Sequence, residues 1–93
     1  MRLDLFLKVS RLVSSRSTAQ HVCDLGLVSV NGAAAKPSKE VKVGDSVVID
    51  RRGRQTTVEI AVVPSAKQVS REQAATLYRL VSDIKKDPID DLA

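Results

Sequence analysis

The apolar residues at the start of the chain recur at helical spacing, which predicts a helix over residues 3–13. The apolar positions are Leu3, Phe6, Leu7 and Val13. The polar residues Asp4, Lys8 and Arg11 are spaced i, i+4 and i+7, so they form one narrow stripe on this helix. We interpret the stripe as a solvated Asp4–Lys8 pair, as the cationic edge of a binding surface, or as both.

A second, short helix follows. It is expected to begin at Ser17, because Ser17 and Gln20 have the spacing of a capping box, although Ser15 competes as the N-cap. Its inner face is predicted to be Ala19, Val22 and Cys23. Gly26 stands where a left-handed residue ends a helix, with Leu27 folding back on Val22.

The middle of the chain has the alternating pattern of a small antiparallel sheet. Residues 28–30 alternate as a half-buried strand, and Asn31-Gly32 is a strong hairpin signal because both residue types tolerate positive φ. We expect the return strand over residues 33–36. Two longer strands are predicted over residues 46–50 and 55–63, joined around Arg51-Arg52-Gly53-Arg54.

The last third of the chain predicts a connector over residues 64–69 and a third helix. Ser70-Arg71-Glu72-Gln73 repeats the capping-box pattern, and Pro88 is expected to end the helix before a frayed acidic tail at Asp90-Asp91. The apolar stripe of this helix is Ala74, Leu77, Tyr78, Val81 and Ile84. The expected fold class is therefore α+β, with a domain over residues 1–63 and residues 64–93 packed on it.

Charge is unevenly distributed along these 93 residues. Residues 1–54 hold ten Lys or Arg against five Asp or Glu, whereas residues 55–93 hold five against six. A basic first part followed by a neutral end is typical of a nucleic-acid-binding protein. The single cysteine allows no intramolecular disulfide, and no apolar run approaches the ~20 residues of a membrane span, so we expect a cytoplasmic protein without a membrane partner.

Catalysis is poorly supported by the residues present, so we expect no enzyme. His21 and Cys23 are two apart on a predicted helix and do not face one another. We expect Cys23 to be a core residue and His21 to lie on the surface, since no acid cluster or second His accompanies it as a metal ligand. The sequence also has no Gly-rich phosphate loop, and we expect no metal or cofactor.

RNA binding is better supported, with Arg16 at its centre. Arg16 precedes the second helix, whose first N–H groups together with the Ser17 hydroxyl would meet a phosphate. The structural alternative for Arg16 is a salt bridge to Asp24 or Glu40. The cations expected to extend the patch are Arg2, Lys8, Arg11, Lys36 and, most weakly, Lys39.

The aromatic content limits how RNA would be recognised. The chain has one Phe, one Tyr and no Trp, so we expect contacts to the backbone and shape of structured RNA, with base stacking nearly excluded. The cluster of Arg51, Arg52 and Arg54 is ambiguous, because a charged hairpin tip is more often merely solvated.

An ordered set of residues through position 50 resembles the S4-type RNA-binding domain. The matching residues are Arg2-Leu3-Asp4, Phe6-Leu7-Lys8, Arg11-Leu12, Ser15-Arg16-Ser17-Thr18-Ala19, Gly26 and Val28-Ser29-Val30-Asn31-Gly32. The resemblance implies the α-L RNA-binding fold, in which two helices and a hairpin face structured RNA.

Within that family the chain is similar to the short bacterial proteins of ribosome-associated quality control, the RqcP family. The similarity extends over Lys36-Pro37-Ser38, Gly44-Asp45, Ala74-Ala75 and Tyr78. The related fifteen-kilodalton heat-shock protein is longer and ends in a basic extension, whereas this chain ends in acidic residues.

This resemblance implies binding to a large ribosomal subunit obstructed by peptidyl-tRNA, with contacts to large-subunit rRNA and to the tRNA. A partner of the RqcH type would direct alanine addition to the stalled chain. By position, Arg2 and Arg16 would carry the binding, Asp4 would orient the N-terminal basic group, and Lys8, Arg11 and Ser17 would assist. The alternatives are a generic rRNA or tRNA chaperone in ribosome assembly, a protein-interaction adaptor, and, least favoured, a small thiol enzyme using Cys23.

Overall fold

The computed structural model describes residues 1–51, 53–65 and 69–85. Two helices, α1 (Leu3–Val9) and α2 (Arg16–Asp24), precede the sheet. Its strands are β1 (Val28–Val30), β2 (Ala33–Ala34), β3 (Ser46–Arg51), β4 (Arg54–Ile60) and β5 (Tyr78–Lys85), with the short helix α3 (Arg71–Ala74) between β4 and β5. The sheet has the order β2-β1-β3-β4-β5 and every pairing is antiparallel. The expected α+β class with two N-terminal helices on a small sheet is confirmed.

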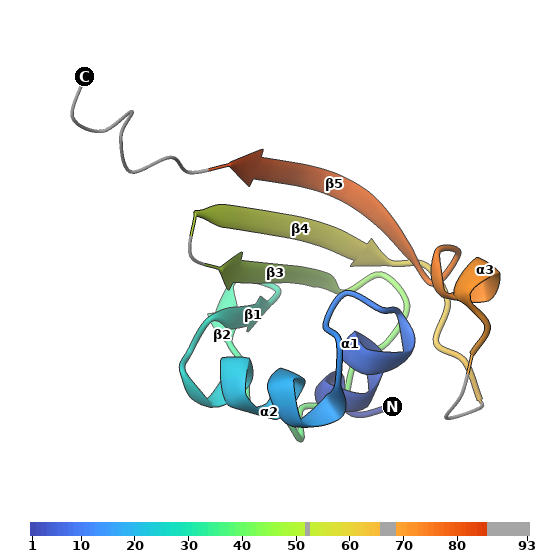
Figure 1. The fold of residues 1–93 in the computed structure, drawn as a ribbon, viewed down its shortest axis with the longest axis horizontal. Coiled ribbons are helices and arrows are strands. Elements are labelled where there is room, and N and C mark those ends of the chain that lie inside the picture. Colours follow the sequence, from blue (N-terminus) through green and yellow to red (C-terminus); the bar gives the residue numbers. More distant parts are fainter. Residues whose placement is uncertain (52, 66–68, 86–93) are drawn as a thin grey trace.

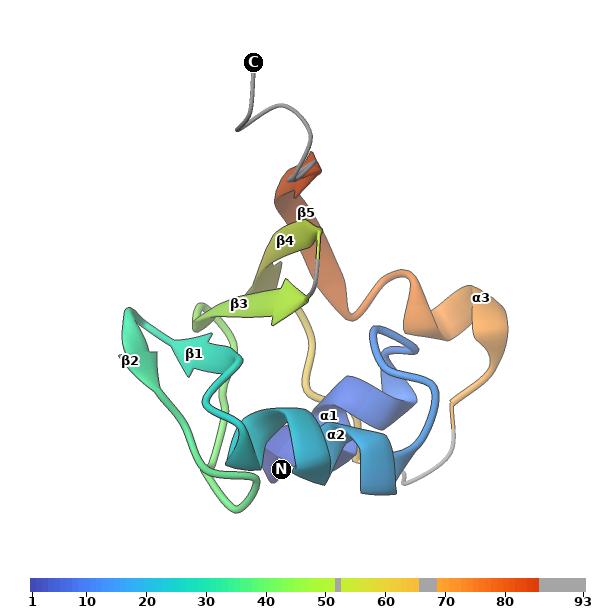
Figure 2. The ribbon, with the colours of Figure 1, turned by 60° about the vertical axis from the view of Figure 1, so that its left-hand side comes forward.

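The core lies between the helix pair and one face of the sheet (Figures 1 and 2). Alternate residues of β1, β3 and β4 face the helices and are buried, as period-2 alternation requires. The largest fully buried apolar side chains are Phe6, Leu3, Leu7, Ile49, Ile60, Val28, Val47 and Val58. This core fixes α1 against α2, and it therefore fixes the spacing of the side chains that the two helices carry.

Helix α1 is shorter than the predicted helix over residues 3–13. It ends at Val9, with Ser10 as the C-cap, and Arg11 takes the left-handed conformation with φ 61°. The amide of Val13 then donates to the carbonyl of Leu7 at 3.1 Å, and Val13 turns into the core. The apolar spacing continues past the end of α1 because Val13, although it lies in the following loop, is also buried in the core.

The ends of α2 show one wrong and one confirmed prediction. Ser15, rather than Ser17, is the N-cap: its backbone is extended and its Oγ accepts from the amide of Thr18 at 3.2 Å. At the other end, Gly26 has φ 76°, and the amide of Leu27 donates to the carbonyl of Val22 at 3.0 Å. This is the predicted Schellman ending.

The predicted hairpin turn at Asn31-Gly32 is confirmed. The two residues have φ 52° and 87°, the positive values that a type I′ turn requires. The return strand is shorter than residues 33–36, because only Ala33–Ala34 form β2. The Asn31 side chain also ties the turn to the start of β3, since its Oδ1 accepts from the amide of Ser46 at 3.0 Å.

The predicted C-terminal helix is wrong beyond its first turn. Its N-cap is correct, since Ser70 Oγ accepts from the amide of Gln73 at 3.2 Å, but α3 ends at Ala74. Residues 78–85 form β5 along β4 instead. A strand there satisfies the edge hydrogen bonds that β4 would otherwise present to solvent, and this tertiary pairing overrides the helical spacing. Pro88 and the acidic tail lie outside the described residues, and the division at residue 63 stays a prediction.

Candidate RNA-binding surface

The carboxylate of Asp4 connects α1 to α2. Its side chain has no exposed surface, although it is charged. Arg16 Nε and Gln20 Nε2 from α2 donate to Oδ2 at 3.3 and 3.0 Å, while Arg2 Nε lies 3.3 Å from Oδ1. We call Arg2, Asp4, Arg16 and Gln20 the Asp4 cluster. The expected solvated Asp4–Lys8 pair is wrong, because Asp4 faces the second helix.

The surroundings of Asp4 favour its ionised form. Burial alone would raise the pKa of this carboxyl, but hydrogen bonds from Gln20, Arg16 and the Leu5 amide, with the charge of Arg16, outweigh burial and lower it below 3.8. A buried carboxylate is tolerated here because each oxygen has donors and two guanidinium groups offset its charge. Asp4 is therefore a fixed anion that holds two arginines.

The geometry of Arg16 differs from both sequence interpretations. It is the first residue of α2 rather than the residue before it, and its ion-pair partner is Asp4 rather than Asp24 or Glu40. Its Nε takes the contact with Asp4, and 41% of the side chain stays exposed. The guanidinium therefore stands at the start of the helix, held on one side and open to solvent on the other.

Arg2 is held in a similar way at the start of α1. It forms a β-bridge with Glu40, and 46% of its side chain is exposed. The amides of Leu3 and Asp4 donate to the carbonyls of Lys39 and Pro37 at 2.8 and 3.1 Å. The loop over residues 36–40 thus occupies the N-terminus of α1, and this packing brings the exposed Lys39 beside Arg2.

The predicted cations do not form one continuous cluster. Ser17 lies in the first turn of α2 beside Arg16, and Lys36 is in the same exposed loop as Lys39. Lys8 is exposed in the last turn of α1, at the opposite end of the helix from Arg2. Arg11 follows that end of the helix and lines a separate cleft. The structure therefore joins Arg2, Asp4 and Arg16 directly and sets Arg11 apart.

Sequence reasoning missed the role of Gln20. We assigned it to a capping box, but its amide nitrogen donates to Asp4. The available signal was its position four residues after Arg16, which puts the two side chains on the same face of α2. Only the packing of α1 against that face shows that they share a carboxylate.

The other titratable side chains of α2 behave as expected. Cys23 is buried, and burial together with the charges of Asp4 and Asp24 raises the pKa of its thiol to about 11. His21 is exposed on the opposite side. Among the described residues, His, Cys, Asp and Glu form no group of three placed to hold a metal ion, and no described helix has the length and apolar character to cross a membrane.

Comparison with known proteins places this chain in a family. The model of the S4 domain matches residues 1–47, which contain both helices and the first hairpin. The RQC P-site tRNA stabilizing factor of Halalkalibacterium halodurans is 46% identical over 89 residues, covering 96% of each chain. The Bacillus subtilis protein of the same name is 41% identical over 85 residues, covering 91% of this chain and 96% of that protein.

The fold agrees with these sequence relationships. The trimeric structure of heat shock protein 15 from Vibrio cholerae superposes with a TM-score of 0.79 at 31% identity, covering 88% of this chain and 82% of the other. The chain belongs to the S4-domain family of RNA-binding proteins, in the group whose members include the RQC P-site tRNA stabilizing factors.

Proposed function

We propose that this protein binds the large ribosomal subunit while it is obstructed by peptidyl-tRNA, and that it contacts both large-subunit rRNA and the tRNA as a non-catalytic clamp. The observation that carries the proposal is the 46% identity to an RQC P-site tRNA stabilizing factor over 96% of both chains. By holding the tRNA, it supports alanine tailing directed by an RqcH-type factor in the cytoplasm.

The Asp4 cluster is the centre of the proposed RNA contact. Arg2 and Arg16 meet phosphates, since each guanidinium is partly exposed while its Nε is near Asp4. A guanidinium already held in place loses less conformational entropy when it binds, and its planar fork fits a phosphate in two hydrogen bonds. Asp4 and Gln20 act as positioning residues for these arginines.

The remaining predicted residues extend this surface. Ser17 adds a hydroxyl at the start of α2, while Lys36 and Lys39 add charge from the loop beside Arg2. Lys8 and Arg11 contact more distant phosphates. Ammonium groups on exposed, flexible side chains act as point charges, so we expect smaller losses from Lys36 or Lys39 than from Arg16.

The test is sedimentation of tagged protein with purified large subunits that do or do not retain peptidyl-tRNA. We expect more binding when the tRNA is present. The logarithm of the binding constant should fall with the logarithm of the salt concentration, with a slope of about −0.7 to −0.9 for each neutralised phosphate. We expect Arg16→Ala to weaken binding more than Arg79→Ala does. Arg79 on β5 is the matched control, because its exposed side chain forms an ion pair with Glu59 on β4.

The outcomes separate the candidate functions. Protein that stays in ribosome-free fractions at low salt contradicts any ribosomal role. If Arg16→Ala and Arg79→Ala lose the same binding affinity, the RNA contact does not lie at the start of α2. Binding to immature particles that lack tRNA, with no preference for obstructed subunits, favours an assembly chaperone instead.

A further inference from the structure

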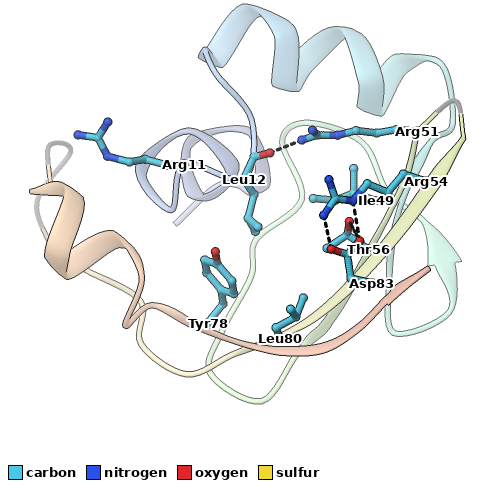
Figure 3. Close-up of a pocket in the computed structure, with 9 residues that line it drawn as sticks. All are labelled: Arg11, Leu12, Ile49, Arg51, Arg54, Thr56, Tyr78, Leu80 and Asp83. Carbon is cyan, nitrogen blue, oxygen red and sulfur yellow. Dashed lines mark hydrogen bonds and ion pairs between the residues drawn. The ribbon is translucent and has the colours of Figure 1, made fainter. Parts of the chain in front are cut away.

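A cleft separates the end of α1 from the outer part of the sheet, on a part of the molecule that the Asp4 cluster does not use. Its volume is about 270 Å³. The residues that line it include Leu12 after α1, Ile49 and Arg51 of β3, Arg54 of β4, and Tyr78 and Leu80 of β5. Figure 3 shows Tyr78 and Leu12 facing one another at one end, with Arg51 and Arg54 along the opposite wall. The cleft thus combines apolar surfaces with cations.

The two cations on the strand side of this cleft, Arg51 and Arg54, are held by hydrogen bonds. Arg51 donates to the carbonyl of Leu12, which ties the end of β3 to the loop between the helices. Arg54 makes a two-point contact with Asp83, in which Nε donates to Oδ1 at 2.7 Å and an Nη group lies against Oδ2. Thr56 Oγ1 also donates to Asp83 at 3.2 Å. The polar wall is therefore a preassembled set of donors and one carboxylate.

A β-bulge produces this wall. Val58 pairs with Leu80 and Thr57 pairs with Ser82, so Val81 is the extra residue on β5. Because side chains alternate along a strand, without the bulge Asp83 would face away from Leu80. The bulge turns Asp83 to the same face as Tyr78 and Leu80, where Arg54 and Thr56 meet it. The irregularity in the sheet therefore places the cleft's carboxylate.

Arg11 stands at the rim of the cleft in a conformation that suits glycine. Its φ is 61°, and its amide donates to the carbonyl of Lys8 at 3.0 Å as it leaves α1. At the corresponding end of α2 the chain has Gly26. Arginine in this position brings backbone strain and gives nothing to the core, because its side chain is exposed and turned outward (Figure 3). Such strain is typical of functional positions.

We infer that the cleft is a second RNA subsite that takes one unstacked nucleobase, with the base against Tyr78 and the neighbouring phosphates at Arg11 and Arg54. The inference rests on the proposed function in taking RNA as the ligand. Tyr78, Leu12 and Leu80 cover the faces of the base, and the Asp83 carboxylate accepts from an exocyclic amino group. The sequence analysis assigned Tyr78 to the apolar stripe of a helix; in the structure Tyr78 lies on β5, is half-buried against the core and lines the cleft.

The size and position of the cleft favour a base of an RNA chain over other ligands. Sites for independent small molecules usually enclose about 300–1,000 Å³, so this cleft suits part of a larger ligand. Arg11 begins the loop that ends just before Arg16, so the rim of the cleft and the Asp4 cluster lie at opposite ends of one connection. We therefore expect one RNA strand to contact Arg16 and to extend along this loop to the cleft.

The direct test is a titration of the full chain with tetraadenylate, observed in ¹H–¹⁵N spectra, with an abasic tetranucleotide as the probe that has phosphates but no bases. We expect tetraadenylate to shift the amides of Leu12, Thr56 and Leu80 strongly, and the abasic strand to shift them much less, because its phosphates reach Arg11 and Arg54 without a base in the cleft. Equal shifts with the abasic strand, or the same shifts with a tetra-aspartate peptide, overturn the inference.

Three variants test the stacking contact at Tyr78 and the phosphate contact at Arg11. Tyr78→Leu weakens tetraadenylate binding by about 5-fold or more, whereas Tyr78→Phe keeps it, because the ring is what contacts the base. Arg11→Gly removes the side chain and relieves the backbone strain, so its binding falls while its melting temperature does not. Wild-type affinity in both Tyr78→Leu and Arg11→Gly, with folded spectra, contradicts the subsite.

Two measurements distinguish failure of this inference from failure of the proposed function. If obstructed large subunits do not bind but tetraadenylate shifts the cleft amides, the ribosomal function fails and the subsite stands. If Arg16→Ala abolishes subunit binding while Tyr78→Leu has no effect on either ligand, the function stands and the subsite is wrong.

Discussion

Arg16 Nε lies 3.3 Å from Oδ2 of Asp4, a carboxylate with no exposed surface. The contact joins the first turn of α2 to the first turn of α1, twelve residues earlier in the chain. It also gives one arginine two tasks, because the same guanidinium that neutralises a buried charge remains partly exposed to solvent. Stability and the proposed RNA contact therefore depend on the same pair.

Asp4→Asn is expected to lower the free energy of unfolding by about 1–3 kcal/mol, because Arg2 and Arg16 lose a charged acceptor and the new amide nitrogen is buried facing donors. Urea unfolding followed by circular dichroism measures this change. Asp24→Asn is the control on the exposed side of α2, where we expect a change within about 0.5 kcal/mol. Equal effects of the two substitutions would contradict the role of Asp4.

The stability that Asp4 provides should depend on pH in a defined window. The pKa of Asp4 in the folded protein lies below its ordinary value of 3.8, so the unfolded chain takes up the proton first as the pH falls. The advantage of the wild type over Asp4→Asn is thus complete above about pH 4 and is lost as the pH falls through the folded pKa. Unfolding curves at pH 7, 4 and 3 test this, and an advantage undiminished at pH 3 would be inconsistent with it.

Ser15→Ala and Ser17→Ala should differ although the residues are two positions apart. Ser15 Oγ accepts from the amide of Thr18, so its loss costs about 0.5–2 kcal/mol of stability. Ser17 is exposed and contacts only the Ser15 hydroxyl among the hydrogen bonds of the described residues, so its replacement should be close to neutral. Thermal unfolding of both variants decides between the two serines as the N-cap, and a larger loss for Ser17→Ala would refute the assignment.

Cys23 should be unreactive at neutral pH. The pKa of its buried thiol is raised to about 11, so almost no thiolate is present to attack iodoacetamide. The unfolded thiol has its ordinary pKa near 9.0, so the stability that the neutral thiol contributes is complete below pH 9 and is lost as the pH rises toward 11.

Mass spectrometry of alkylated native protein measures this reactivity, with protein unfolded in urea as the control. Cys23→Ala provides the reference for stability at pH 8 and pH 10.5, because it has no thiol to ionise. Rapid alkylation of the native protein at pH 7 would revive the interpretation of Cys23 as a reactive thiol.

The sequence by itself determined the features that depend on neighbouring residues. Gly26 and Asn31-Gly32 specify their turns because few residue types tolerate positive φ, and Ser70 specifies a cap through one local hydrogen bond. The apolar alternation of residues 28–30 likewise predicted a strand with one buried face. The S4 family was recognisable for the same reason, since its motif is a series of such local signals.

Only the tertiary structure decided the features that depend on contacts between distant segments. Asp4 has the spacing of a surface residue, and it became the buried centre of a charge cluster when α2 packed over it. Residues 78–85 have helical spacing as well as strand-forming residues. They form a strand because their backbone pairs with the edge of β4. The cleft at Tyr78 exists because of that choice. The burial of Asp4 and the pairing of β5 with β4 are properties of the assembled fold, so no local pattern along the chain encodes them.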